Sequence, residues 1–233
     1  MTDLVLHFAP DTCARVPLIA LEEIGQPFTI EIVAFMASQH LSPAYLALNP
    51  SGKVPTLVID GETLTENVAI LTWFADNFPE AGLLPSATGL TRIRQLADLA
   101  YCASGLHPLV TRLRIPHFFC DLPDAQQRVF DMAESAMHLH FAIIDERLGK
   151  SRWWYGDRWS IVDAYLNWIW FRVTGTDFDA AGFSHFARHD AAMKTRPAVI
   201  RALERNDRIA ALLADQGLTV TFSGPGAVTA AAK

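Results

Sequence analysis

Apolar residues in the first third of the chain follow two different spacings. Short runs carry an apolar residue at every second position, which is the period of a half-buried strand. Longer runs carry apolar residues three and four positions apart, as on one face of a helix. Gly61 separates two strand patterns and indicates a tight hairpin. The predicted elements are strand 4–8, helix 13–25, strand 28–33, helix 42–50, hairpin arms 56–60 and 62–64, and helix 67–79.

Beyond the turn-rich stretch "EAGLLPSATG" the pattern is helical only, with predicted helices at 90–118, 124–149, 160–174, 182–195 and 197–213. This change predicts an α/β domain followed by an all-helical domain. We place these domains at residues 1–80 and 89–220, with a linker at 81–88 and a flexible tail at 221–233. Ser160 and Asp163 have the spacing of a capping box at the start of one helix.

Composition excludes several classes of protein. Hydrophobic residues make up 51% of the 233 residues, so most of the chain is expected to fold, and a formal net charge of −6 argues against binding of nucleic acid. The three cysteines have no regular spacing, which argues against a disulfide framework and a zinc site. The N-terminus has no signal-peptide pattern, and the most apolar helix is too short for a bilayer. We therefore expect a cytoplasmic protein without a metal and without a membrane anchor.

Pro55 stands where a strand pattern begins. Proline cannot donate to a strand ladder, so it fits the first residue of a strand. A Val54–Pro55 bond at such an entry is a candidate for the cis isomer, which would turn the backbone N–H and C=O of Val54 toward an extended ligand. A simple strand start explains the proline equally well, so the sequence leaves both interpretations open.

Glu66 and Asn67 stand where a helix pattern begins. Backbone N–H groups at a helix N-terminus carry partial positive charge and can receive a carboxylate. Asn67 is also a candidate N-cap, and Glu66 could receive an ammonium group. The pair therefore suits a ligand with both an α-carboxylate and an α-amine, although ordinary capping is the commoner role of such residues.

Cys13 follows the first strand and lies at the start of the first helix. A helix N-terminus favours the thiolate form of a cysteine, and Arg15 adds a positive charge nearby. Pro10 and Asp11 are expected to shape the turn, and Thr12 could cap the helix. A small buried cysteine with no chemical role is the alternative.

Three segments together resemble the cytosolic glutathione transferases: "NPSGKVPTLVIDGETLTENVAILTWFAD", "WWYGDRWSIVDAYL" and "RPAVIRAL". The resemblance spans most of the chain. It implies a thioredoxin-like domain followed by a helical-bundle domain, with glutathione as co-substrate. It also implies that the backbone of Val54, before a cis Pro55, pairs with the cysteinyl part of glutathione. The implied glutathione-binding residues are Lys53, Val54, Pro55, Glu66 and Asn67.

The segment "FAPDTCARVPL" is similar to the bacterial beta-type transferases, in which a cysteine at this place faces the sulfur of glutathione. "CASGLHPL" matches the stretch that supplies a histidine to the site, here His107. The candidate catalytic residues are Cys13 and His107, which the resemblance implies, and Arg15, which is chosen for its charge near the thiol. The sequence departs from the beta-type pattern at Asn67, where many relatives have serine or glycine, and at Pro108, where a lysine is usual.

Pro108 and Pro116 interrupt the long helix predicted at 90–118, so we expect that helix to be bent. The apolar residues expected to form a substrate pocket are Phe35, Tyr101, Phe118 and Trp168, together with Arg172.

The resemblance implies an enzyme of detoxification, most simply a bacterial homodimer. The thiolate of bound glutathione would attack small apolar electrophiles or exchange with a disulfide through Cys13. A ligand-binding protein without catalysis and a glutathione-dependent lyase or etherase acting on aromatic ethers are the alternatives. A shared fold does not decide among the three.

Overall fold

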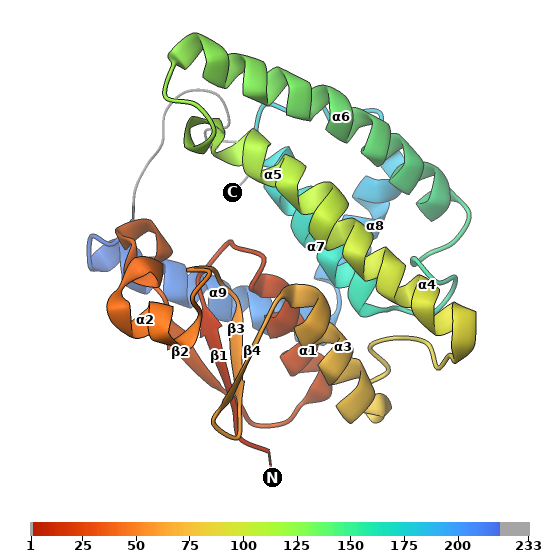
Figure 1. The fold of residues 1–233 in the computed structure, drawn as a ribbon. Helices are drawn as coiled ribbons and strands as arrows, with labels where there is room; N and C mark the ends of the chain where they lie inside the picture. Colours follow the sequence, from red (N-terminus) through yellow and green to blue (C-terminus); the bar gives the residue numbers. More distant parts are fainter. Residues whose placement is uncertain (1, 220–233) are drawn as a thin grey trace. The chain divides into compact units, whose positions relative to one another are not determined.

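The computed structural model describes residues 2–219 and divides into two compact units. Among the described residues, the first unit is 2–84 together with 195–219, and the second is Pro85–Lys194. The predicted tail at 221–233 lies outside the described residues. The expected order of an α/β part followed by helices is confirmed (Figure 1).

The first unit is built on a mixed sheet of four strands in the order β2-β1-β3-β4. The strands are β1 (Leu4–Phe8), β2 (Thr29–Ile32), β3 (Thr56–Ile59) and β4 (Glu62–Thr65). β1 runs parallel to β2 and antiparallel to β3, and β3 forms the predicted hairpin with β4. Gly61 takes φ 88° between the two hairpin arms, a conformation that glycine adopts without steric cost.

The helices of the first unit are α1 (Arg15–Ile24), α2 (Pro43–Leu48), α3 (Asn67–Asn77) and α9 (Pro197–Asp215), with short 3₁₀ turns at Phe35–Ala37, Gln39–Leu41 and Pro79–Ala81. α1 is almost entirely buried and packs against both α3 and α9. It ends at Gly25, which has φ 73° and donates its N–H to the carbonyl of Leu21, as the sequence predicted for a glycine stop.

Helix α9 differs from its predicted place, because we had counted residues up to 220 with the helical domain. It groups with the first unit and lies along α1, although the two helices are far apart in the chain (Figure 1). Glu22 of α1 accepts hydrogen bonds from both Arg201 (2.6 Å) and Arg205 (2.5 Å) of α9. The spacing of apolar residues along the chain does not predict such contacts between helices that are distant in sequence.

The second unit is helical. Its elements are α4 (Gly89–Ala100), a π-helical segment η4 (Tyr101–Leu106), α5 (His107–Arg114), a 3₁₀ turn η5 (Pro116–Phe118), α6 (Pro123–Gly149), α7 (Ile161–Thr174) and α8 (Ser184–Lys194). α6 packs against α5 and α8, and α7 packs against the same two helices. Buried side chains such as Phe141, Tyr165 and Phe186 fill the space between them.

The helix predicted at 90–118 changes its form around Pro108. The backbone N–H of His107 donates to the carbonyl of Cys102, five residues earlier, so a wider π turn precedes the proline. Such a turn accommodates a residue that has no N–H for the regular α-helical ladder. The helix then ends at Arg114, and Ile115 takes an extended φ of −139° before Pro116.

The capping box predicted at Ser160 and Asp163 is confirmed. Asp163 Oδ2 accepts from the Ser160 backbone N–H and from Ser160 Oγ, both at 2.8 Å. Its other oxygen accepts from the Trp154 N–H (2.8 Å) and is paired with His189 Nε2 (2.9 Å). A single buried carboxylate therefore connects the start of α7 with the preceding loop and with α8.

Within residues 2–219, no helix has both the length and the apolar character needed to cross a membrane. The same part of the chain contains no cluster of three or more histidine, cysteine or acidic side chains placed to hold a metal ion.

Candidate functional site

The ends of three strands meet at one edge of the sheet. His7 near the end of β1 is paired with Thr56 at the start of β3, and Thr56 is paired with Thr65 at the end of β4. The segments that follow β1, precede β3 and follow β4 therefore emerge together. These segments carry Cys13, the Val54–Pro55 bond and Glu66–Asn67. The fold therefore brings these predicted site residues close together.

Cys13 lies directly against the turn that precedes β3. Its thiol donates to the carbonyl oxygen of Val54, with 3.4 Å between Sγ and O. The side chain is nearly covered, at 8% exposure. The Val54–Pro55 bond is cis, as one of the two interpretations of the sequence predicted.

The turn around Cys13 is fixed by local hydrogen bonds. Thr12 Oγ1 donates to the carbonyl of Ala9 (2.7 Å) and accepts from the N–H of Ala14 (3.3 Å). α1 begins at Arg15 with Ala14 in the N-cap position. Thr12 therefore stabilises the turn before the helix, whereas we had expected it to cap the helix itself.

Asp11 anchors this turn to α9. It has a left-handed φ of 61°, its backbone N–H donates to Asn206 Oδ1 (2.9 Å), and Asn206 Nδ2 donates back to Asp11 Oδ1 (3.0 Å). Asn206 is buried and lies 195 residues away in the chain. No local pattern in the sequence indicates this pairing or points to Asn206 as a functional residue.

Arg15 also contacts Asp11. Its Nη2 donates to Asp11 Oδ1 at 2.8 Å, and the arginine is only 4% exposed. The expected positive charge beside the Cys13 turn is present, and it forms an ion pair with a carboxylate of the same turn. Any effect of Arg15 on a thiolate is therefore reduced by Asp11.

Glu66 has the most unusual backbone of the site. It is the N-cap of α3, with φ 69° and ψ 122°, which is a rare conformation for a residue with a side chain. Strained positions of this kind concentrate at ligand sites. The glutamate side chain is exposed, so it is accessible to a ligand.

Asn67 is the first residue of α3 and not its N-cap, which corrects the sequence analysis. Its Nδ2 donates to the carbonyl of Cys13 at 3.1 Å. The side chain is buried and turned toward the Cys13 turn, because the unusual backbone of Glu66 already forms the helix entry. Asn67 thus links the two segments that carry the thiol and the helix N-terminus.

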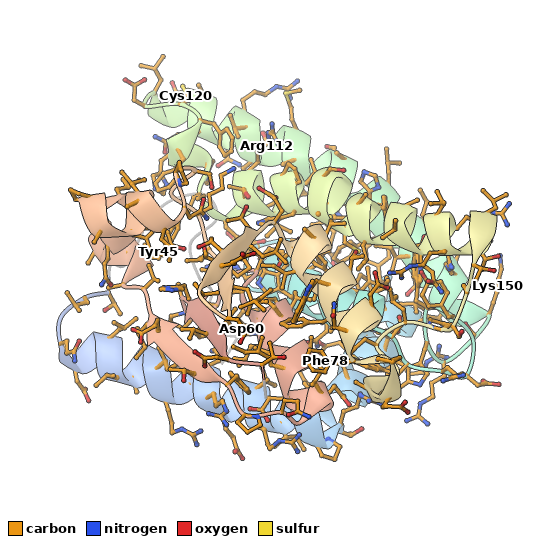
Figure 2. The ribbon with its side chains drawn as sticks, turned by 60° about the horizontal axis from the view of Figure 1, so that its bottom comes forward. Tyr45, Asp60, Phe78, Arg112, Cys120 and Lys150 are labelled. Atoms are coloured by element: carbon orange, nitrogen blue, oxygen red, sulfur yellow. The ribbon has the colours of Figure 1, made fainter. Side chains whose placement is uncertain are left out.

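The turn before Pro55 is supported from α2. Tyr45 (Figure 2) and Asn49 Nδ2 both donate to the carbonyl of Lys53, at 2.7 and 2.8 Å. Burial raises the pKa of the Tyr45 hydroxyl, so it remains a donor. The Lys53 side chain is exposed at the same turn. Tyr45 and Asn49 were not selected from the sequence, because a helix residue and a helix C-cap with no functional motif give no signal of this role.

His107 belongs to the second unit and lies in an aromatic environment. Its Nδ1 is 3.4 Å from the hydroxyl of Tyr165, and its ring meets Trp168 edge-on with 4.7 Å between centroids. Trp168 is buried. Two of the predicted residues, His107 and Trp168, are thus in contact, and Tyr165 joins them.

The other residues predicted for an apolar pocket have separate surroundings. Tyr101 pairs with His140 of α6, with 2.9 Å between the hydroxyl and Nδ1, and burial raises the pKa of this tyrosine to about 12. Phe118 is 62% exposed. The guanidinium of Arg172 lies 5.9 Å from the ring centroid of Phe171.

Phe35, the remaining member of that set, belongs to the first unit. It stacks on His40 with 3.8 Å between ring centroids and an interplanar angle of 10°. Burial lowers the pKa of His40, which favours the neutral ring. The predicted set is therefore distributed over the two units.

The three cysteines differ in environment, and none forms a disulfide. Cys102 is completely buried in the helical unit, and burial raises its pKa, so its thiol stays protonated. Cys120 is partly accessible in the segment between η5 and α6 (Figure 2). Cys13 alone among them lies at the edge of the sheet where the strand ends meet.

A thioredoxin-like sheet with a cysteine at a helix start, a cis-proline turn against it and a following helical unit defines a class of thiol-handling proteins. A family model described as glutathione S-transferase, N-terminal domain, matches residues 12–77. Glutathione S-transferase GstA of Escherichia coli O157:H7 is 31% identical over 200 residues, which are 85% of this chain and 96% of that relative. The chain belongs to the glutathione S-transferase family.

Solved structures agree with this assignment. A sphingomonad glutathione S-transferase complexed with glutathione superposes with a TM-score of 0.76 at 31% identity, covering 87% of this chain and 98% of that one. A beta-class transferase of Sphingomonas chungbukensis gives the same TM-score of 0.76, identity of 31% and coverage of 87% and 98%. The expected fold and the resemblance to the bacterial beta-type transferases are therefore confirmed.

Proposed function

We propose that this chain binds glutathione at the edge of the sheet formed by the Cys13 turn, the Val54–Pro55 turn and the start of α3. The backbone N–H and C=O of Val54 pair with the cysteinyl part of the peptide. Glu66 and the N-terminus of α3 receive its γ-glutamyl ammonium and carboxylate, and the Lys53 side chain lies at the same turn. The glutathione complex of the sphingomonad relative supports this proposal.

The observation that carries the proposal is the contact of Cys13 with Val54. A ligand whose cysteinyl backbone pairs with Val54 has its sulfur next to the thiol of Cys13, since Sγ is only 3.4 Å from the Val54 carbonyl. Asn67 holds the carbonyl of Cys13 at 3.1 Å and so keeps the turn next to α3. One edge of the sheet thus serves both the cysteinyl and the γ-glutamyl residue of the tripeptide.

Two reactions follow from this placement. The glutathione thiolate can attack an electrophilic carbon, forming a C–S bond while the leaving group departs with the bonding electron pair. The Cys13 thiolate can instead attack one sulfur of oxidised glutathione, forming a mixed disulfide and releasing one glutathione thiolate, which then takes up a proton. In both cases the edge supplies binding and orientation, which alone lower the barrier substantially.

The helical unit is proposed to supply the surface for small apolar electrophiles. Trp168 gives an apolar face, and His107 beside it can exchange a proton or donate a hydrogen bond. Tyr101, Phe118 and Arg172 remain candidates for this surface, and Phe35 remains a separate candidate in the first unit.

A homodimer is proposed from exposed apolar residues on the helical unit. Leu90 and Ile93 of α4 are exposed, as are Met132, Leu139 and Ile143 of α6. Exposed apolar side chains at helical spacing are typical of an interface between subunits. Cytoplasmic location and a role in detoxification are proposed on the same basis as the activity, from the family.

The test is glutathione binding by isothermal titration together with conjugation of 1-chloro-2,4-dinitrobenzene. The proposal predicts binding and turnover by the full chain. Binding without turnover on several electrophiles would favour a ligand-carrying role, and absence of binding would overturn the assignment of the edge. Glu66→Ala is expected to weaken binding, whereas Glu62→Ala, which removes an exposed glutamate at the start of β4, leaves it unchanged.

A further inference from the structure

The helix that carries His107 has a wider turn directly before this residue. Between α4 and α5, which follow one another in Figure 1, the π-helical segment η4 covers Tyr101–Leu106. The backbone N–H of His107 donates to the carbonyl of Cys102, five residues earlier. Single π turns inside α-helices are rare and often occur at functional sites. His107 is the first residue after this turn, so the turn determines where its side chain lies.

Pro108 gives a physical reason for the wider turn. A proline inside an α-helix has no N–H to donate, and its ring clashes with the carbonyl of the residue four positions earlier. In a continuous α-helix that carbonyl would belong to Ser104. The wider turn avoids this contact, and Pro108 then lies in the first turn of α5, where a helix tolerates a missing N–H.

Side chains of α5 support the backbone directly after the turn. Thr111 Oγ1 donates to the carbonyl of His107 at 3.1 Å. Nη1 of Arg112 (Figure 2) donates to the carbonyl of Pro108 at 3.0 Å. The residues that follow the turn are therefore held by hydrogen bonds of their own helix.

The start of the turn directs Tyr101 toward α6. The hydroxyl of Tyr101 is 2.9 Å from Nδ1 of His140. Gly105 leaves room for the tyrosine ring, because a Cβ at that position would lie only 3.2 Å from Cδ2 of Tyr101. Ser104 Oγ donates to the carbonyl of Ala100 at 2.7 Å, and contacts of this kind often bend helices. The entry to the turn thus suits a residue that contacts α6.

The end of the turn directs His107 toward α7. The ring of His107 meets Trp168 edge-on with 4.7 Å between centroids, and its Nδ1 is 3.4 Å from the hydroxyl of Tyr165. Tyr165 is completely buried and Trp168 is nearly so. Tyr101 and His107, at the two ends of one π-helical segment, therefore contact different helices.

A continuous α-helix would place another residue beside Trp168. A π turn takes in one residue more than an α turn, and one residue corresponds to about 100° of rotation at 3.6 residues per turn. Without the extra residue, Leu106 would occupy the place of His107, and the imidazole would turn away from Trp168. A leucine at that place could neither donate a hydrogen bond nor exchange a proton.

We infer that Pro108 is a positioning residue for the proposed reaction: it maintains the π turn that holds the imidazole of His107 beside Trp168. The proline ring has no group that takes part in proton transfer, so Pro108 acts through His107. The inference rests on the proposed function for the role of His107. The placement of the imidazole is a separate matter that can be measured without turnover.

NMR of protein labelled at the histidine ring carbons tests this placement, with His107→Ala used to assign the signal of His107. The ring current of Trp168 should displace this signal, and Trp168→Leu should abolish the displacement. Pro108→Ala restores a backbone N–H and should abolish it as well. The matched control is Pro116→Ala, which removes the proline at the start of η5 and should leave the signal of His107 in place.

Kinetics of conjugation test the functional part of the inference. His107→Ala and Pro108→Ala should each lower kcat by roughly a hundredfold, the lower end of what a positioned acid or base contributes, with KM for glutathione unchanged. The double variant should be no slower than His107→Ala alone, because both substitutions remove the same contribution. In the Pro108→Ala protein, Leu106→His together with His107→Leu should recover part of the lost kcat.

An unchanged His107 signal in Pro108→Ala would overturn the inference, because the imidazole would then keep its place without the proline. A displaced signal with normal kcat, or additive losses in the double variant, would also overturn it. Pro108→Gly likewise restores the donor and replaces Pro108→Ala if that variant does not fold. A wild type that binds no glutathione would refute the proposed function, and the histidine signal would still show whether Pro108 places His107.

Discussion

The sulfur atom of Cys13 lies 3.4 Å from the carbonyl oxygen of Val54, although 41 residues separate them in the chain. Strand pairing produces this contact, since the end of β1 and the start of β3 share one edge of the sheet. The carbonyl of Cys13 is in turn held by Asn67. Hydrogen bonds therefore connect the thiol of Cys13 with the cis-proline turn, and the backbone of Cys13 with the N-terminus of α3.

Asn67→Ala removes the hydrogen bond to the Cys13 carbonyl. We expect the free energy of unfolding to fall by about 1–2 kcal/mol, because a buried acceptor loses its donor. The Kd for glutathione should rise several-fold because the turn loses its anchor to α3. Urea unfolding and isothermal titration measure the two effects.

The control for that variant is Asn77→Ala at the other end of the same helix. Asn77 Nδ2 also donates to a backbone carbonyl, that of Trp73 at 2.9 Å, but in an exposed place. Loss of this hydrogen bond should change the free energy of unfolding by less than about 0.5 kcal/mol and leave the Kd for glutathione unchanged. If the two variants have the same unfolding free energy and the same glutathione affinity, Asn67 does not support the glutathione site.

Asn206→Ala tests the distant support of the Cys13 turn. The variant deprives Asp11 of a donor and an acceptor, so unfolding should become easier by about 1–3 kcal/mol. Glutathione should bind more weakly, because Asp11 no longer holds the turn in its left-handed conformation. Arg208→Ala, an exposed position on the same helix, is the control and should behave as the wild type. An Asn206 variant with normal glutathione affinity would show that α9 does not support the site.

Iodoacetamide labelling distinguishes Cys102 from Cys120. Cys102 is completely buried and burial raises its pKa, so it should remain unlabelled in the native protein at pH 8. Because the folded pKa is raised, the thiolate is scarce at all pH values below it, and raising the pH to 9 should not expose the residue. Cys120 is expected to react. Peptide mass mapping gives the result, and rapid labelling of Cys102 would contradict its described burial.

Asp163→Ala should be among the most destabilising substitutions in the helical unit. It removes the acceptor for the Ser160 and Trp154 backbone groups and leaves His189 without its carboxylate. Loss of one partner of a buried pair costs about 3–5 kcal/mol. Asp157→Ala, an exposed neighbour, is the control. A change below about 1 kcal/mol in urea unfolding would show that the network is dispensable.

The sequence predicted what local rules determine. Periodicity located the strands and most helices, Gly25 marked the end of α1, and the S-x-x-D spacing identified the capping box at Ser160. The neighbourhood of Cys13, Pro55 and Glu66 also followed, because each flanks a strand end. These features depend on residues within a few positions of one another.

What the sequence did not predict depends on long-range packing. Asn206 supports the Cys13 turn from 195 residues away, and α9 lies on α1 through side chains that look like ordinary surface charges. The actual partner of Asn67 was missed for the same reason. The apolar set around Trp168 stays a prediction, because residue type alone does not give the direction of a side chain.

The most direct measurement of the central claim is the intact mass of the protein after incubation with oxidised glutathione. The wild type and the Cys120→Ala control should each gain one glutathionyl group, and Cys13→Ala should gain none. This result would place the sulfur of glutathione next to Cys13, as the contact with Val54 requires. A modification that persists in Cys13→Ala, or an unmodified wild type, would contradict it.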